Sequence, residues 1–158
     1  MLTNQTISFA EAKLIAERCI AVGQANGVAI AVAIVDQAAR PILLYCLDGA
    51  IPVAAEAALV KARTAVFMRE STAHIELRRR ERPIDTSVFK VFEVEGGVPF
   101  FVGEDTSLTG QCCGGMGVAG AFNISEVVSA GLAAWGERQR FDHDSETSVA
   151  VHGASDRL

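Results

Sequence analysis

The chain has 158 residues, half of them hydrophobic but few of them aromatic, and its formal net charge is −5. This length suits a single domain, and the acidic balance argues against a generic surface for nucleic acids or anionic membranes, which needs an excess of Lys and Arg. The longest apolar run, residues 28–35, is too short to span a membrane. Because no export signal is recognisable, we expect a cytoplasmic protein whose four cysteines are reduced thiols.

The first part of the chain predicts a helix followed by a β-hairpin. Ser8 and Glu11 form a capping-box pattern, and the apolar residues that follow recur at helical spacing as far as Asn26. In the predicted strand of residues 28–36, bulky Val or Ile alternates with small Ala from residue 28 to residue 34. Both faces of this strand are apolar, so we expect both to be covered, the Ala face by a helix or by another subunit. A short turn leads to a strand at 42–47, which favours an antiparallel hairpin.

The second part of the chain predicts helices, two further strands and a last helix. Pro52 fits the first turn of an alanine-rich helix, and Asn123 can cap the last helix. The predicted elements between these points are two helices and two strands, at residues 52–68, 71–82, 98–102 and 110–121. Helices packed against an antiparallel sheet make an α+β arrangement. The sequence from Phe141 is polar and aperiodic, which predicts a domain of residues 1–140 and a disordered tail of residues 141–158.

Residues 115–120, GMGVAG, match the pattern G-x-G-x-x-G between a predicted strand and a predicted helix. A dinucleotide site needs this pattern within a βαβ unit, with an acidic residue after a second strand. Here one helix and a polar tail follow instead. We therefore interpret the glycines as part of a strand that another backbone approaches closely.

Five short motifs occur in the same order as in one protein family, and at a similar spacing. They are VxIVD at 32–36, LDGA at 47–50, KARTA at 61–65, GGVP at 96–99 and GVAG at 117–120. On these motifs the chain resembles the GlcG/HbpS-like family, which includes the C-terminal domain of PduO-type proteins, from the first helix to about Trp135. The resemblance implies a profilin-like fold, a homo-oligomer, haem or related tetrapyrrole binding in some members, and association with catabolic operons. Family members often have Gly in the turn where this chain has Ala39.

The implied haem raises the question of which residue could bind its iron. Histidine is scarce: His143 and His152 lie in the predicted tail, and only His74 lies within the domain. His74 is either a solvated surface residue or an axial ligand at a subunit interface. Sulfur and phenol side chains are alternative ligands. The residues of this kind that could bind the iron instead are Tyr45, Cys46, Met68 and Met116.

A ligand site is predicted where the alanine-rich helix meets the glycine-rich strand. Lys61 and Arg63 carry cations on that helix, either solvated or paired with an anion such as a propionate or another carboxylate. Glycines remove side chains and let a flat ligand come close. The candidate ligand-binding residues are Lys61, Arg63, Thr64, Gly115, Met116 and Gly117, with His74 as the candidate metal ligand.

Three functions are open at this point. The first is a small oligomeric protein that binds haem or a related tetrapyrrole and could also degrade it. The second is an accessory or small-molecule-transforming protein of a catabolic operon that acts on an anionic metabolite, and the third is a structural or sensory module. No nucleophile–base–acid set is recognisable, so the sequence does not decide whether the protein is an enzyme. The two-sided apolar strand predicts self-association, and we expect no nucleic-acid or membrane partner.

Overall fold

The computed structural model describes residues 5–81, 91–102, 110–120 and 124–153, and for residues 141–153 the backbone only. Its elements follow in the order α1 (Phe9–Ala25), β1 (Ala31–Asp36), β2 (Pro41–Cys46), α2 (Ala54–Met68), α3 (Thr72–Glu81), β3 (Gly97–Val102), β4 (Gln111–Ala119) and α4 (Ser125–Gly153). Each predicted helix and strand corresponds to one of these elements. No helix within the described ranges is long and apolar enough to cross a membrane.

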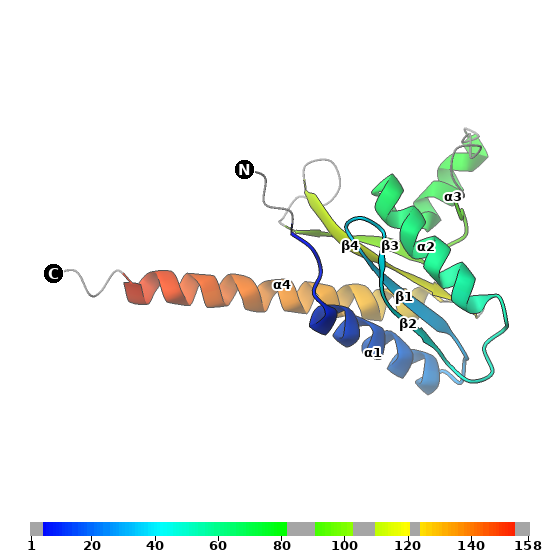
Figure 1. Ribbon diagram of the computed structural model, residues 1–158, viewed down its shortest axis with the longest axis horizontal. Helices are drawn as coiled ribbons and strands as arrows, with labels where there is room; N and C mark the ends of the chain where they lie inside the picture. The colour runs from blue at the N-terminus through cyan, green and yellow to red at the C-terminus, as the bar shows by residue number, and fades with distance from the viewer. Residues whose placement is uncertain (1–4, 82–90, 103–109, 121–123, 154–158) are drawn as a thin grey trace.

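The four strands form one antiparallel sheet in the order β2–β1–β4–β3, so β2 and β3 are its edges. Helices cover both faces: α2 and α3 lie on one side, and α1 and α4 lie on the other (Figure 1). Every residue of β1 is buried. Val32 and Ile34 belong to the core beneath α1 and α4, whereas Ala31 and Ala33 belong to the core beneath α2. A helix of the same chain therefore covers the Ala face, and this strand no longer supports the prediction of self-association.

Helix α2 lies directly on β4, and the glycines of β4 make this possible. A Cβ on Gly117 would lie 2.0 Å from the carbonyl oxygen of Ala58 and 2.6 Å from the backbone nitrogen of Ala62. Gly115 faces the same helix, and a Cβ there would lie 2.8 Å from Val66. This is the close backbone approach that the glycine pattern predicts.

The ends of the chain show one confirmed prediction and one difference. Ser8 caps α1, because its Oγ accepts a hydrogen bond from the Glu11 backbone while the Glu11 carboxylate accepts one from the Ser8 backbone. Helix α4 continues to Gly153, although the sequence predicts a disordered tail from residue 141. No glycine or proline lies between Gly136 and Gly153, so nothing in the sequence interrupts a helix that has already formed. The last part of α4 extends beyond the sheet (Figure 1).

The predicted domain limit at residue 140 stays a prediction. The predicted cap Asn123 lies outside the described residues.

Candidate functional site

Lys61 is buried on α2, with 5% of its surface exposed. Its Nζ donates a hydrogen bond of 3.0 Å to the carbonyl oxygen of Val118 and lies 5.7 Å from the centre of the Phe92 ring. Burial lowers the pKa of Lys61, and the carboxylates of Glu95 and Glu76 offset part of this effect. The ammonium therefore joins α2 to the end of β4.

Three of the motifs that carry the family resemblance meet at this ammonium. Gly96 has a φ of +126°, and a Cβ there would lie 2.4 Å from the Val118 carbonyl oxygen and 3.1 Å from Lys61 Nζ. A Cβ on Gly97 would lie 2.5 Å from the carbonyl oxygen of Lys61. The motifs KARTA, GGVP and GVAG thus form one packed junction, in which the glycines leave room for the ammonium to reach its acceptor.

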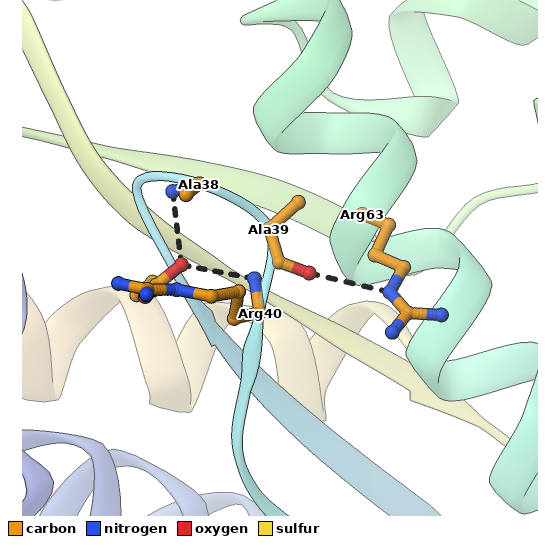
Figure 2. A network of polar contacts seen from close by, with 5 residues as sticks. Ala38, Ala39, Arg40 and Arg63 are labelled. Atoms are coloured by element: carbon orange, nitrogen blue, oxygen red, sulfur yellow. Dashed lines mark hydrogen bonds and ion pairs between the residues drawn. The ribbon is translucent and has the colours of Figure 1, made fainter.

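Arg63 and Thr64, the next predicted site residues, also bond within the chain. Arg63 Nε donates a hydrogen bond of 3.2 Å to the carbonyl oxygen of Ala39, in the turn between β1 and β2 (Figure 2). Ala39 has a φ of +59°, the left-handed conformation that favours glycine, which is the residue that the resemblance implies there. Thr64 Oγ1 donates to the carbonyl oxygen of Val60 and accepts from the backbone nitrogen of Phe92.

The same turn is held by Asp36. Its Oδ1 accepts hydrogen bonds of 2.9 Å from the backbone nitrogens of Ala38 and Arg40 (Figure 2). Its Oδ2 accepts one of 2.7 Å from Arg40 Nε. Burial alone would raise the pKa of Asp36, but these hydrogen bonds outweigh it and hold the pKa below its usual value. The Asp36 carboxylate is therefore occupied by its own turn.

The cysteines are free thiols that mostly pack in the core. Cys113 belongs to the core beneath α1 and α4, whereas its neighbour Cys112 packs against the core beneath α2, as expected for adjacent residues of a strand. Burial raises the pKa of Cys19 and of Cys113 to about 12. Cys46 is exposed on the edge strand β2.

Most of the predicted ligand-binding residues are covered within one chain. Lys61 and Thr64 are buried, Gly115 and Gly117 lie beneath α2, and Met116 lies in the opposite core with its Sδ 3.8 Å from Cys19 Sγ. Arg63 is partly exposed. Their ligand-binding role stays a prediction, and the structure places the candidate metal ligand in a different region.

An open cleft of about 400 Å³ lies at the edge of the sheet, where β3 runs between α3 and α4. The predicted metal ligand His74 lines it from α3. The apolar part of the lining comes from β3 and α4. It consists of Val98, Pro99, Phe101, Leu132 and Trp135.

Trp135 fixes α4 against β3 and forms one wall of this cleft. Its ring centre lies 5.2 Å from that of Phe100, with the two rings tilted. Its Nε1 donates a hydrogen bond of 3.3 Å to the carbonyl oxygen of Phe101, and Gln139 Nε2 donates to the same oxygen. Leu132, one turn before Trp135, is 41% exposed and presents an apolar side chain to the cleft.

The free side of β3 is closed by side chains. Thr72 Oγ1 accepts a hydrogen bond of 2.8 Å from the Gly97 backbone. Pro99 has no N–H to donate, and Trp135 and Gln139 occupy the carbonyl oxygen of Phe101. Such an edge discourages the addition of another strand. The cleft over it is therefore better suited to a small molecule than to an extended peptide.

The polar part of the cleft lining consists of Arg69, Glu70, Ser71, His74 and Gln139. His74 Nδ1 lies 2.8 Å from Glu70 Oε1, and 67% of the His74 side chain is exposed. Arg69 ends α2 in the left-handed conformation, with a φ of +52°, and its guanidinium carbon lies 5.6 Å from the centre of the Phe101 ring. Arg69 also donates to the carbonyl oxygen of Gly110. An apolar cleft with one imidazole and one guanidinium suits a flat ligand that carries acidic groups.

Of the residues that line this cleft, the sequence predicts only His74 as a site residue, as the candidate metal ligand. The helical spacing of Leu132, Trp135 and Gln139 predicts that they share a face of α4. It does not predict that this face meets β3, because the two segments are far apart in the sequence. Within the described part of the chain, no group of three or more His, Cys, Asp or Glu residues could hold a metal ion.

Comparison with known proteins supports the family that the five sequence motifs indicate. A family model described as haem degrading protein HbpS-like matches residues 7–133. The chain belongs to the HbpS-like family. No curated protein matches the sequence closely enough to count as a relative. The matched range includes Lys61 and its glycine neighbours and the cleft residues Arg69, His74 and Leu132. It ends before Trp135 and Gln139, the other two residues that α4 contributes to the cleft.

Several solved structures share the HbpS-like fold. A doubly substituted HbpS from Streptomyces reticuli superposes with a TM-score of 0.73 at 24% identity, over 84% of this chain and 89% of that chain. ORFY from Klebsiella pneumoniae gives a TM-score of 0.73 at 21% identity, over 86% and 94% of the two chains. PduOC, solved as a complex with haem, gives a TM-score of 0.70 at 22% identity, over 82% of this chain and 94% of that chain. The predicted family and the predicted α+β fold, with helices on an antiparallel sheet, are confirmed.

Proposed function

We propose that this HbpS-like protein binds haem or a related tetrapyrrole in the cleft between α3, β3 and α4. The observation that carries the proposal is the position of His74, an imidazole at the rim of an apolar cleft lined by Trp135 and Phe101. A tetrapyrrole needs apolar contacts for its ring, an axial ligand for its iron and cations for its propionates. Arg69 supplies a cation at this cleft.

The size and openness of the cleft also bear on assembly. Ligand sites commonly have volumes of about 300–1,000 Å³ and bury most of the ligand. An open cleft of about 400 Å³ would cover only part of a tetrapyrrole. We therefore propose a homo-oligomer in which a second subunit covers the rest. When haem is bound, its iron supplies redox chemistry, while Trp135, Arg69 and His74 bind and orient the ligand.

Two comparisons support the proposal. The matching family is described by haem degradation, and PduOC has been solved with haem. The proposed site differs from the one that the sequence predicts beside Lys61. The Lys61 ammonium already has the Val118 carbonyl as its acceptor. Arg69 is better placed to meet an acidic group of the ligand, because it lines the cleft with His74.

A second candidate function follows from Arg69 alone. An anionic metabolite smaller than haem could bind the guanidinium against the Phe101 ring, where their separation is 5.6 Å. The protein would then be an accessory or small-molecule-transforming protein of a cytoplasmic catabolic pathway. Small carboxylates are the ligands that test this candidate.

Two exposed leucines provide a matched experiment. Leu132 lines the cleft and is 41% exposed, whereas Leu77 lies on α3 outside the lining and is 60% exposed. Replacing either by Glu adds the same charge at an exposed position. Haemin titration of the parent should show a shifted Soret band. Leu132→Glu should weaken haemin binding at least about tenfold through desolvation and propionate repulsion, and Leu77→Glu should not.

If Leu132→Glu binds haemin as the parent does, the cleft is not the haem site. If the parent does not bind haemin but binds small carboxylates, and Arg69→Ala abolishes that binding, the second candidate replaces the first.

A further inference from the structure

We infer that Glu70 is a positioning residue for His74, because its carboxylate holds the imidazole in the tautomer that leaves Nε2 free for a metal. The inference rests on the proposed function, since it concerns the same cleft. Glu70 Oε1 lies 2.8 Å from His74 Nδ1. An ionised carboxylate only accepts hydrogen bonds, so Nδ1 must carry the proton. A neutral imidazole has one N–H, and Nε2 therefore keeps its lone pair.

The backbone around Glu70 is fixed by the corner between α2 and α3. Arg69 adopts the left-handed conformation there, and its backbone nitrogen donates to the carbonyl oxygen of Val66. The Glu70 nitrogen donates to the carbonyl oxygen of Ala65. This is a common way to end a helix, and it sets where the Glu70 side chain starts. Helix α3 then places His74 four residues after Glu70.

Arg78 holds the second oxygen of the same carboxylate. Its NH2 group lies 2.7 Å from Glu70 Oε2, and the Glu70 side chain is 19% exposed. His74 and Arg78 lie one turn apart on α3, and Glu70 lies in the corner just before this helix, so its carboxylate bridges an imidazole and a guanidinium on one side of α3. Arg78 thereby fixes the position of the Glu70 carboxylate, and a carboxylate held against a ligating histidine fixes its tautomer and raises its basicity.

This network is suited to orientation more than to stability. The His74 side chain is 67% exposed and that of Arg78 is 44% exposed. Exposed ion pairs contribute little to the free energy of unfolding. If Glu70 had a purely structural role, its removal would therefore change the free energy of unfolding little and nothing else. If Glu70 positions His74, its removal changes the tautomer of His74 and the properties of an iron that His74 binds.

The first test uses the ligand-free protein and does not depend on haem. Ring-nitrogen NMR of 15N-histidine-labelled protein at alkaline pH distinguishes the two neutral tautomers, and loss of a signal in His74→Ala identifies His74. The parent should show the Nδ1–H tautomer. Glu70→Ala should shift the population toward the Nε2–H tautomer. A parent in the Nε2–H tautomer, or a Glu70→Ala variant with an unchanged ratio, would overturn the inference.

The second test uses the haem-loaded protein. Loss of a carboxylate that supports a ligating histidine typically weakens metal binding about 10–100-fold, and Glu70→Ala should lower haemin affinity within that range. The reduction potential of the iron should rise, because a less basic ligand stabilises ferric iron less. Glu70→Gln should lie between the parent and Glu70→Ala, since its amide oxygen still accepts a hydrogen bond.

Glu17→Ala is the matched control, because Glu17 forms an exposed ion pair with Lys13 on α1, away from the cleft. Glu17→Ala should change neither the tautomer of His74 nor the reduction potential of the bound iron. If Glu70→Ala binds haemin with the affinity and potential of the parent, the positioning role is wrong even where haem binds. If the parent binds no haemin, the proposed function fails, while the tautomer measurement still decides the role of Glu70.

Discussion

Gly117 lies where α2 comes closest to the sheet, and Gly117→Ala tests how α2 packs on β4. The added Cβ would lie 2.0 Å from the carbonyl oxygen of Ala58 and 2.6 Å from the backbone nitrogen of Ala62. Both are backbone atoms inside a helix, so no side chain can rotate away and α2 must move as a body. That movement would also draw Lys61 away from Val118.

The expected loss of stability is large for a single methyl group. Overpacking a core typically costs about 1–3 kcal/mol. Because both contacts are with rigid backbone, we expect the upper end of this range, about 3 kcal/mol or more. For a chain of this size, that free energy corresponds to a fall in Tm of about 6–12 °C. The loss of stability is measured by thermal unfolding, monitored by circular dichroism, and by urea unfolding.

Gly136→Ala is the matched control, since it adds the same methyl group to α4 where, among the described residues, no atom outside the adjoining helix backbone lies within 4 Å. Alanine is more favourable than glycine in a helix by about 1 kcal/mol, so this variant should melt about 2–4 °C higher than the parent. A Gly117→Ala variant that melts within about 1 °C of the parent would refute the close packing of α2 on β4.

Three further predictions concern the buried amine, the thiols and the end of the chain. Burial lowers the pKa of Lys61 below 10.5, so the unfolded chain binds more protons just below that pH. The free energy of unfolding should therefore rise with pH there, and Lys61→Met should remove the rise in urea unfolding at several alkaline pH values. Cys46→Ser should remove the fast phase of reaction with a thiol reagent, while the buried Cys19 and Cys113 react only on unfolding. Deleting residues 141–158 should leave Tm and assembly nearly unchanged, and a large loss of either would show that the end of α4 packs against the rest of the protein.

Local patterns in the sequence were sufficient to predict most of the fold. The capping box at Ser8 and the alternation in residues 28–34 depend on neighbouring residues, and both predictions hold in the structure. The alternation could not decide whether a helix or a second subunit covers the Ala face, because either can pack on small side chains. The polar sequence from residue 141 has no apolar periodicity and so gives no signal for a helix, yet α4 continues to Gly153, because such a segment can still extend a helix that has already formed.

The site was harder to predict, because its residues meet through the fold. His74 could be identified since it is the only histidine in the predicted domain. A cation on an alanine-rich helix gives the same sequence pattern whether it faces a ligand or binds a carbonyl group 57 residues away, as Lys61 does, so its ligand-binding role stays a prediction. Trp135 and Arg69 come together with His74 only because α4 and the end of α2 both reach β3.

The central claim is that His74 binds haem iron in the cleft, and a haemin titration of His74→Ala tests it most directly. Arg80→Ala is the control, because Arg80 lies on the same helix, is 72% exposed and is not part of the lining. The parent and Arg80→Ala should give the same Soret spectrum and affinity. His74→Ala should bind haemin at least about tenfold more weakly with an altered spectrum, and added imidazole should restore the spectrum of the parent. A His74→Ala protein with the affinity and Soret band of the parent would contradict the claim.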